Sequence, residues 1–522
     1  MWGSLSSWGP IVNRAPNGGG KQPPRRMPSC PTLFLLAAQI LHGQSGDLAG
    51  RLAQARQLMA SGRFEEAIPL YRQIVKAEPG NPGLLLNLGL AQHMAGHDRD
   101  AIPTLEAVLR TQPDSLPALI SLGSARLALN QPNDAIAPLR KAVNGKPGDH
   151  ETRGMLASAL LDAKRPDEAG VEYRKLTDAA SEDPRAWYGL GMAYQATAAA
   201  AFEQLQKAGA TSPYVAALVA DTRVQRRQFR SGFFFYNEAA KQLPLLHGIH
   251  AALADVYRKT GHADWAAAED AKERALPPAD CGAHPAECQF AGGHDLQILT
   301  QPHHGTWPPE ALYWRAKAAN ELAMQALFRL GQLPPSAELH QLRAEIARGQ
   351  GQHLESAREW REALVLMPGN PRLRRELAAS LFMAQDYRAA LAEAESMLQS
   401  EAKSPELNFI AGDSLLRLEE PEKAVAYLKT ALGSNPSLLA ADASLGLALS
   451  RLGNHAAAVP HLEKALVLDE DGSLYYQLGR AYQAMGQREK ATAAMAKYQE
   501  ILKQAEEQKE AVAREAQIGP PR

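Results

Sequence analysis

Residues Trp187–Tyr194 have the sequence WYGLGMAY, which fits the pattern W-x2-L-G-x2-Y at every fixed position. Weaker copies of this pattern occur on both sides of it, and almost all of residues 48–503 divide into units of about 34 residues. A period of this length predicts an array of similar units, in which each unit contacts its neighbours and the core extends along the array. The three or four separate domains ordinarily expected for 522 residues are therefore not predicted.

Prolines and small residues mark the period most clearly in the first part of the chain. Pro79, Pro113 and Pro147 are spaced 34 residues apart, and each closes a unit. Small residues occur ahead of each proline at the positions where a pair of helices needs them: Ala55, Gly89 and Gly123 on the first helix, and Ala67, Ala101 and Ala135 on the second. Glycine or alanine at these positions allows two helices to approach without a Cβ clash, and larger apolar neighbours then occupy the remaining space.

These motifs resemble the tetratricopeptide repeat (TPR) family, and the resemblance extends over residues 48–503. It implies an all-α fold, an α-solenoid in which about 13 units, two of them degenerate, form a right-handed superhelix of helix hairpins. It also implies a concave groove, lined by the first helices, in which proteins of this family bind peptides or partner domains.

The two degenerate units lack the turn between their helices. After Tyr194 the sequence continues directly into Ala198 and Phe202, so residues 187–207 are predicted to form one long helix. Residues Tyr313–Leu330 repeat this form. The predicted organisation is a disordered or signal segment at 1–46, repeat arrays at 48–183, 187–278 and 311–503, an irregular loop at 279–310, and a capping helix and tail at 504–522.

The N-terminal segment contains an apolar run, Pro31–Leu41, that follows Arg25 and Arg26. This order resembles a secretory signal peptide and predicts a periplasmic or secreted protein. If Met27 is the start of translation, however, no basic region precedes the apolar run. The alternative is an N-terminal helix packed on the first repeat of a cytoplasmic protein. The run is too short for a transmembrane helix, which needs roughly 20 residues, so no integral membrane span is predicted.

The charge composition argues against a nucleic-acid partner. The 56 basic and 57 acidic residues give a net charge of -1, so no overall field favours nucleic acid or an anionic membrane. An RNA-binding solenoid would rest on one arginine cluster alone, Arg223, Arg226, Arg227 and Arg230. That role would need a longer basic stripe with interleaved aromatic residues. The predicted partner is therefore a protein or a peptide.

The family resemblance places particular first-helix positions on the groove. In the early units these positions are apolar: Leu52, Leu86, Leu90, Ile120, Leu127 and Leu161. In the later units they are charged or aromatic, and they are the candidate partner-binding residues: Tyr188, Tyr214, Asp221, Asp255, Arg258, Glu345, Arg348, Asp413, Arg417, Arg451 and Tyr476. The functional interpretation is a groove that holds an apolar segment in its first part and recognises charge in its later part.

Both sets of residues have a purely structural alternative. The leucines could belong to the core between repeats, because an error of one residue in the register would turn them inward. Three pairs among the charged candidates have helical i,i+3 or i,i+4 spacing: Asp255–Arg258, Glu345–Arg348 and Asp413–Arg417. Such pairs stabilise a solvated helix by about 0.2–0.5 kcal/mol and need no ligand.

Residues 279–310 have no helical period and contain Cys281 and Cys288 together with His284 and His294. Three states are open to the cysteines: a disulfide, reduced thiols, or metal ligation together with the histidines. A disulfide is the simplest state if the chain is exported, because oxidising compartments preserve such bonds. The residue spacing fits no common structural zinc pattern, so no metal site is predicted.

The sequence lacks the motifs that would indicate catalysis. H-E-x-x-H, G-x-S-x-G and G-x-G-x-x-G are missing, and we predict no catalytic residue and no cofactor. The chain is therefore expected to be a non-enzymatic interaction scaffold that holds a peptide or partner protein in its concave groove. The alternative is a regulatory or targeting subunit of a glycosyl-transfer, secretion or envelope-assembly complex.

Overall fold

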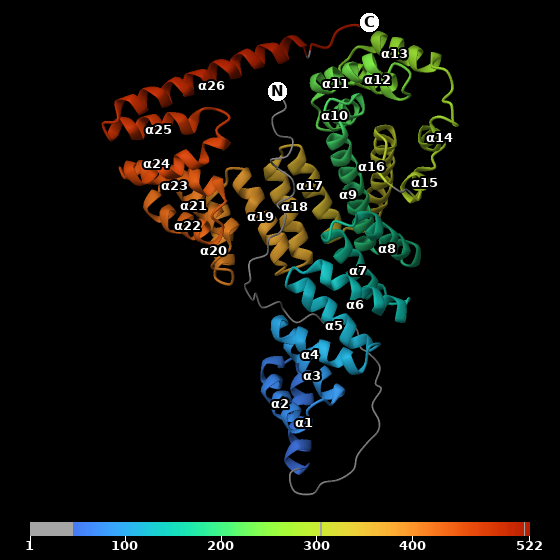
Figure 1. Ribbon diagram of the computed structural model, residues 1–522, viewed down its shortest axis with the longest axis vertical. Helices are drawn as coiled ribbons and strands as arrows, with labels where there is room; N and C mark the ends of the chain where they lie inside the picture. The colour runs from blue at the N-terminus through green and yellow to red at the C-terminus, as the bar shows by residue number, and fades with distance from the viewer. Residues whose placement is uncertain (1–44, 303–304, 516, 522) are drawn as a thin grey trace. The chain divides into compact units, whose positions relative to one another are not determined.

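The computed structural model describes residues 45–302, 305–515 and 517–521, and every regular element in these ranges is a helix (Figure 1). The helices form repeated hairpins, which confirms the predicted all-α solenoid fold. The predicted signal segment Pro31–Leu41 lies outside the described residues. Within the described ranges, no helix is both long enough and apolar enough to span a membrane.

The described chain forms two compact units. The first consists of residues 45–186 together with Met367–Arg374 and Ser396–Ser404. Its complete helices are α1 (Ser45–Ala60), α2 (Phe64–Ala77), α3 (Pro82–Met94), α4 (Asp98–Thr111), α5 (Leu116–Ala128), α6 (Pro132–Gly145), α7 (His150–Asp162) and α8 (Pro166–Ala179). Each odd-numbered helix packs against the next one to form a hairpin, and each hairpin contacts its neighbour.

The second unit consists of Trp187–Leu366, Arg375–Glu395 and the chain from Pro405 onward. Its first half contains α9 (Pro184–Ala208), α10 (Pro213–Gln225), α11 (Phe229–Gln242), α12 (Ile249–Lys259), α13 (Ala263–Ala275), α14 (Pro285–Ala291), α15 (Asp295–Thr300) and α16 (Pro309–Gln332). Its second half contains α17 (Ala337–Gly349), α18 (His353–Leu366), most of α19 (Pro371–Met383) and most of α20 (Tyr387–Leu398), α21 (Pro405–Arg417), α22 (Pro421–Ser434), α23 (Leu439–Arg451), α24 (His455–Ala465), the short 3-10 helix Leu466–Leu468, α25 (Ser473–Ala484) and α26 (Arg488–Glu515).

Local sequence signals explain where the helices begin and turn. Pro82 occupies the first position of α3, where its missing N–H costs nothing, and the Asn81 side chain accepts hydrogen bonds from two backbone N–H groups of the first turn. Between the two helices of a hairpin the chain adopts a positive φ, at Gly62 (74°), Gly96 (84°) and Asn130 (57°). Glycine and asparagine are the residues that tolerate this conformation most readily.

A glycine on the first helix and a leucine on the second make the closest approach within several hairpins. Four hairpins share this contact: Gly89–Leu105, Gly123–Leu139, Gly412–Leu428 and Gly446–Leu462. In each pair the residues are 16 positions apart, and a Cβ built on the glycine would lie 2.5–2.7 Å from the leucine side chain. All four leucines are completely buried. The missing Cβ therefore provides the space that the leucine occupies.

The long helices α9 and α16 make the same kind of contact although residues 209–308 lie between them. A Cβ built on Gly191 of α9 would lie 2.4 Å from Cδ2 of Leu327 near the end of α16. At the other end of the pair, Tyr214, which closely follows α9, packs against Tyr313 near the start of α16 with ring centroids 5.3 Å apart. The two helices are therefore antiparallel neighbours (Figure 1).

This pairing differs from the interpretation of the sequence, in which the two long helices are separate degenerate units. The sequence correctly predicts one uninterrupted helix at each position, α9 and α16. A single long helix, however, cannot bury its apolar face by itself and needs another element to cover it. The structure meets this requirement by pairing α9 with α16 and inserting residues 209–308 between them.

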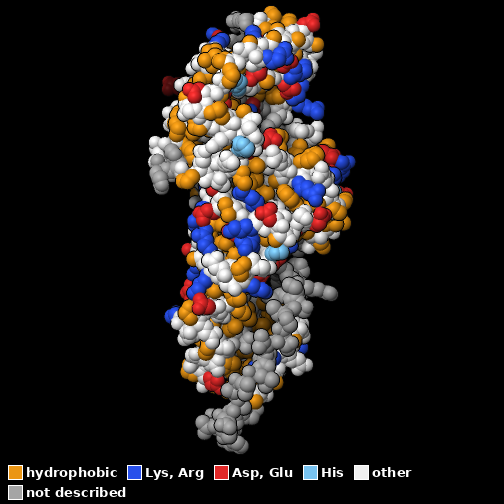
Figure 2. Space-filling view, turned by 90° about the vertical axis from the view of Figure 1, so that its right-hand side faces the viewer, with side chains coloured by type: hydrophobic (Ala, Val, Ile, Leu, Met, Phe, Trp, Pro, Cys, Tyr) orange, Lys and Arg blue, Asp and Glu red, His pale blue; other side chains and the backbone are white. Residues whose placement is uncertain are grey.

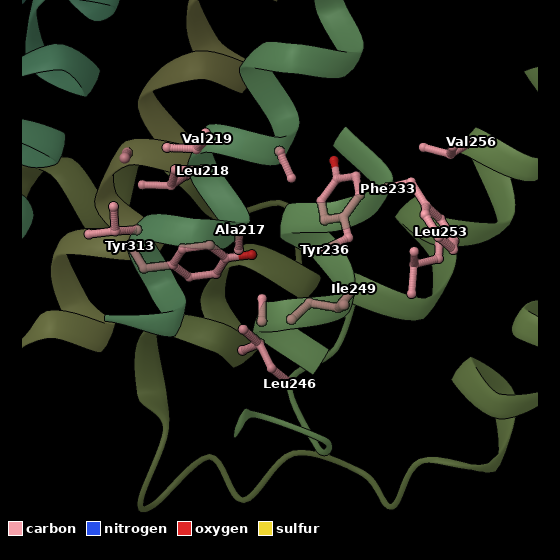
Figure 3. Packing of buried hydrophobic residues seen from close by; sticks show 14 of the residues in the cluster. Ala217, Leu218, Val219, Phe233, Tyr236, Leu246, Ile249, Leu253, Val256 and Tyr313 are labelled. Atoms are coloured by element: carbon pink, nitrogen blue, oxygen red, sulfur yellow. The ribbon is translucent and has the colours of Figure 1, made fainter. Parts of the chain in front are cut away.

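The inserted hairpins pack on the other part of α16. Side chains from α10, α11, α12 and α16 point into one common interior (Figure 3). Val219, Ile249 and Tyr313 are among the buried members of this cluster. In contrast, Leu330 of α16 packs in a different cluster with residues of α9 and α17. The C-terminal half of α16 thus packs with α9 and α17, and its N-terminal half packs with the inserted helices α10, α11 and α12.

Two predicted segments have a different structure from the one expected. Residues 279–310 contain the short helices α14 and α15 and are therefore not entirely irregular. Helices of six or seven residues are too short to give a recognisable hydrophobic period. At the C-terminus, the predicted capping helix is the continuation of α26, which also supplies the second helix of the last repeat. Residues 517–521 follow it as non-helical chain.

Candidate partner-binding sites

Asp221, a groove candidate on α10, is held by two neighbouring helices. The Tyr236 hydroxyl donates a hydrogen bond to Asp221 Oδ1 at 2.5 Å, and Lys317 Nζ donates to Oδ2 at 3.0 Å. Burial and the negative charge of Asp221 both raise the pKa of Tyr236 far above its ordinary value. Asp221 therefore links α10 to α11 and α16, and its oxygens are engaged within the protein.

Tyr188 and Glu345, two further candidates, are partners of each other. The Tyr188 hydroxyl donates a hydrogen bond to Glu345 Oε1 at 2.9 Å, which connects α9 to α17. Trp187 and Tyr188 also pack against a buried cluster that contains Leu330 and Leu342. Tyr188 and Glu345 therefore help to hold α9 against α17 within the second unit.

Three of the charged candidates, Asp255, Arg258 and Arg348, form ion pairs different from those suggested by their spacing. Arg258 pairs with Asp270 of α13, at 2.8 Å, while Asp255 pairs with Lys259. Arg348 pairs with Glu376 of α19. Helical spacing suggests the intrahelical pairs Asp255–Arg258 and Glu345–Arg348, but spacing along one helix does not take account of side chains on neighbouring helices. The structure forms neither, since the adjacent helix offers a carboxylate to each arginine.

Asp413 is the one charged candidate that the structure removes from the surface. It is 3 % exposed, and it accepts a hydrogen bond from Ser444 at 2.6 Å and one from Arg417 at 3.3 Å. The intrahelical Asp413–Arg417 pair is therefore present. The Arg451 guanidinium donates to the backbone carbonyl of Leu416 at 2.8 Å. These contacts join α21 to α23, so Asp413 is a structural residue.

The remaining aromatic candidates have different surroundings. Tyr214 packs on Tyr313, and burial raises the pKa of Tyr214 to about 12. Tyr476 is 38 % exposed and lies beneath the Arg480 guanidinium, whose carbon is 5.9 Å from the ring centroid. Among these two, Tyr476 is the one whose ring is accessible to a partner.

The apolar candidates of the first unit form a partly exposed stripe on its first helices. We call this set the leucine stripe: Leu52 of α1, Leu86 and Leu90 of α3, Ile120 and Leu127 of α5, and Leu161 of α7. Each member is half-buried. Leu52 and Leu86 pack against buried clusters of their own hairpins, which fixes their inner atoms. On the face shown in Figure 2, hydrophobic side chains are interspersed with charged ones.

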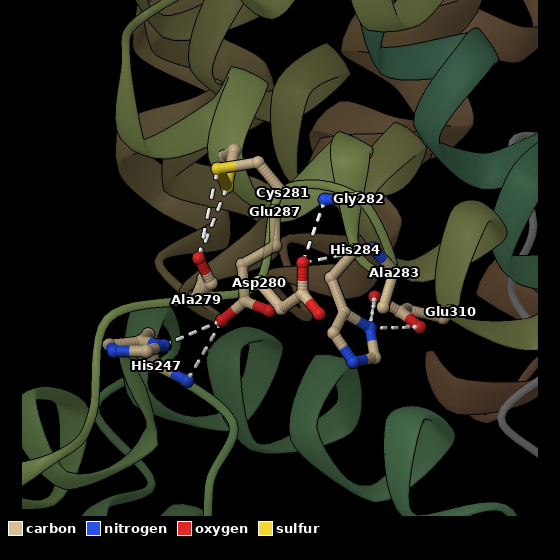
Figure 4. Close-up of a disulfide and its surroundings, with 10 residues drawn as sticks. His247, Ala279, Asp280, Cys281, Gly282, Ala283, His284, Glu287 and Glu310 are labelled. Atoms are coloured by element: carbon tan, nitrogen blue, oxygen red, sulfur yellow. Dashed lines mark hydrogen bonds and ion pairs between the residues drawn. A yellow bond between two sulfur atoms is a disulfide. The ribbon is translucent and has the colours of Figure 1, made fainter.

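The insertion contains a disulfide between Cys281 and Cys288 (Figure 4). It closes a short loop that contains His284, and Glu287 follows on the first turn of α14. His284 Nδ1 lies 2.9 Å from Glu310 Oε1, and this hydrogen bond raises the pKa of His284. The disulfide holds both sulfur atoms, so they do not ligate a metal with His284 and His294, which was one alternative for this loop.

A different group of potential metal ligands lies beside the disulfide. Ligand atoms of His284, Glu287 and Glu310 all lie within 4.8 Å of one another. Glu287 is buried and bonds to His247 Nδ1 at 2.7 Å, while His284 bonds to Glu310. These groups therefore satisfy one another through hydrogen bonds. The sequence does not indicate Glu287 and Glu310, because they match no metal-binding motif and Glu310 belongs to α16.

Comparison with known families settles the architecture of the repeats. Tetratricopeptide-repeat models match residues 58–124, 126–193, 411–473 and 472–501. The chain is a TPR protein. This result confirms the family resemblance seen in the sequence, and proteins built from such repeats are generally scaffolds for protein interaction.

Solved structures with similar helices include several TPR proteins. The structure of the MamA protein is 20 % identical, covers 33 % of this chain and 94 % of its own, and has a TM-score of 0.29. A TPR protein from Parabacteroides merdae is 14 % identical, with coverages of 65 % and 100 % and a TM-score of 0.31. YrrB, described as a TPR protein with an unusual peptide-binding site, is 21 % identical, with coverages of 30 % and 82 % and a TM-score of 0.27. No curated protein matches the sequence.

Lys317 of α16 supplies the cation that pairs with Asp221 of α10. Replacing Lys317 by Met keeps the length of the side chain but leaves Asp221, only 20 % exposed, without its cation. We expect Lys317→Met to lower the free energy of unfolding by roughly 1–2 kcal/mol, measured by urea denaturation followed by circular dichroism.

The matched control is Lys259→Met, which removes the cation from the more exposed Asp255. A change below about 1 kcal/mol is expected there, because exposed ion pairs contribute little. If Lys317→Met were as stable as the control, the Asp221–Lys317 pair would not stabilise the fold, and Asp221 would again be a candidate for partner binding.

Proposed function

We propose that this TPR protein is an interaction scaffold that binds a peptide or partner protein in the concave groove formed by its first helices. The observation that supports this most directly is the leucine stripe of the first unit. Leu52, Leu86 and Ile120 occupy the same position in three successive repeats, 34 residues apart. An extended or helical ligand that follows the array would therefore meet an apolar side chain in each of these repeats.

Partial burial of the leucine stripe favours the binding of a ligand. Each stripe residue already packs its inner atoms, so it loses little side-chain freedom when a ligand covers its outer atoms. Covering a complete leucine side chain is worth about 1.5–3 kcal/mol, and the part of each stripe side chain that is still exposed can contribute a share of this value. Apolar surface that remains accessible at regular intervals along an array supports an interaction site.

The repeats of the second unit supply a separate set of charged and aromatic candidates on their own first helices. Arg258, Arg417 and Arg451 remain exposed although each has a contact within the protein. Tyr476 has an accessible ring. We propose that these four residues recognise acidic and aromatic groups of a partner, while Asp221 and Asp413 contribute to stability.

We also propose that the protein is exported to the periplasm or secreted. The apolar run Pro31–Leu41 after Arg25 and Arg26 supports this, and so does the disulfide between Cys281 and Cys288, since such bonds persist in oxidising compartments.

The binding proposal predicts that polar substitutions in the stripe weaken partner capture. The partner is first isolated by affinity capture with the intact protein from cells that produce it, and its affinity is then measured by calorimetry. We expect Leu86→Gln combined with Ile120→Gln to weaken binding by roughly tenfold or more, because two apolar contacts are replaced by polar groups.

The control for this experiment is Leu70→Gln combined with Leu109→Gln. These two leucines are also half-buried in the first unit, but they belong to the second helices α2 and α4. Their substitution is expected to lower stability to a similar degree and to leave the affinity unchanged. Equal affinity of both double variants would refute binding along the first helices.

Export predicts a defined mature N-terminus. Mass spectrometry of the protein purified from its native cells is expected to find a chain that begins at or near Gln44, directly after the apolar run. Non-reducing peptide mapping of the same sample should recover Cys281 and Cys288 in one linked peptide. A mature chain that retains residues 31–41, with both thiols free, would contradict export.

A further inference from the structure

Four aromatic side chains gather on the hairpin formed by α12 and α13 and on the neighbouring α11. His262 stacks on Trp265 with ring centroids 4.2 Å apart and an interplanar angle of 15°. Tyr257 meets the edge of Trp265 at 5.7 Å and packs against Phe233 at 5.5 Å. We call Phe233, Tyr257, His262 and Trp265 the aromatic site. Its members come from three helices and one turn, and Phe233, Tyr257 and Trp265 pack in or against one buried cluster.

The aromatic site belongs to the last hairpin before the array is interrupted. In the regular stretches, the second helix of a hairpin packs on the first helix of the next one, as in α2–α3, α4–α5, α6–α7, α11–α12, α22–α23 and α24–α25. Within the described ranges, no contact of this extent joins α13 to α14. The end of a repeat array normally needs a cover, because each hairpin leaves an apolar face for its neighbour.

The chain's own C-terminal segment reaches this hairpin. The Tyr257 hydroxyl donates a hydrogen bond to the backbone carbonyl of Gly519 at 2.7 Å. Ile518 is half-buried and packs against the same buried cluster as Trp265. Tyr257 itself is 2 % exposed, so its hydroxyl has few alternative acceptors and the carbonyl of Gly519 satisfies it.

The sequence of this segment fits an aromatic surface. Gly519 is followed by Pro520 and Pro521, and residues around proline favour an extended backbone that loses little entropy on binding. Extended proline-containing peptides are commonly recognised by aromatic side chains, and a hydroxyl or indole N–H then bonds to a peptide carbonyl. Here the carbonyl bonded by Tyr257 is the one that immediately precedes a proline.

We propose that the aromatic site is a binding site for an extended peptide of the form apolar residue–small residue–Pro-Pro, and that residues 517–521 occupy it as an intramolecular ligand. The aromatic site belongs to the second unit and the leucine stripe to the first, so this inference does not depend on the proposed function of the groove. A Cβ built on Gly519 would meet nothing within 4 Å. The small position therefore accepts alanine as well as glycine.

The test uses a variant of the full chain that ends at Ala516 and a fluorescent peptide with the sequence of residues 513–522. Fluorescence anisotropy is expected to show saturable binding to the shortened chain. The full-length chain should bind the same peptide at least several-fold more weakly, because its own C-terminal segment competes at high effective concentration. No saturable binding to the shortened chain, or equal binding to both chains, would overturn the proposal.

Substitutions in the protein and in the peptide test the contacts. Tyr257→Phe in the shortened chain removes one hydrogen bond, and we expect a loss of affinity of about three- to tenfold. The matched control is Tyr482→Phe, since Tyr482 is the equivalent residue of α25 and its hydroxyl bonds to Glu463 of the preceding helix α24. This control should bind as the parent does.

In the peptide, replacement of Ile518 by Ser should weaken binding, whereas replacement of Gly519 by Ala should preserve it. Full binding by Tyr257→Phe, or by the peptide with Ser at position 518, would show that the peptide binds elsewhere and would refute the assignment.

Discussion

The close contact between a first-helix glycine and a second-helix leucine is the interaction on which the hairpins depend. A glycine within a helix costs about 1 kcal/mol relative to alanine, whereas complete burial of a leucine contributes about 1.5–3 kcal/mol. The contact is therefore favourable only where the leucine is fully enclosed, as Leu105, Leu139, Leu428 and Leu462 are. It also fixes how the two helices align, because the leucine side chain fits only at the position of the glycine. Stacking of the aligned hairpins then buries a continuous core along each stretch of the array.

This constraint explains how much of the fold could be predicted from the sequence. In a regular repeat the glycine and its leucine are 16 residues apart, so the pattern is local and the hairpins could be placed without a structure. For Gly191 the leucine is Leu327, 136 residues later. The sequence predicts that α9 is one long helix, because no turn follows Tyr194, but its local pattern does not indicate which distant helix covers it. The pairing of α9 with α16 is a consequence of the three-dimensional fold.

The same distinction applies to the candidate sites. The repeat pattern assigns residues to first helices, and in the structure the members of the leucine stripe lie half-buried on those helices. It does not predict the partners of polar side chains, since these come from other helices: Asp221 meets Lys317 of α16, and Asp413 meets Ser444 of α23. The contact of Tyr257 with Gly519 joins residues 262 positions apart and was equally inaccessible to pattern analysis. The structure thus shows which polar candidates are bonded within the fold and which, such as Arg417 and Arg451, have exposed side chains.

Disulfide trapping between positions 191 and 327 tests the pairing of α9 and α16 most directly. In a Cys30→Ser background, Gly191→Cys and Leu327→Cys would place two sulfur atoms at the closest approach of the helices, where a Cβ at position 191 lies 2.6 Å from Leu327 Cγ. Non-reducing peptide mapping is predicted to recover peptides that link positions 191 and 327, with the Cys281–Cys288 disulfide retained. Gly191→Cys with Phe328→Cys, at a side chain that is 71 % exposed, should give free thiols. Free thiols at 191 and 327, or the same yield from both variants, would contradict the account.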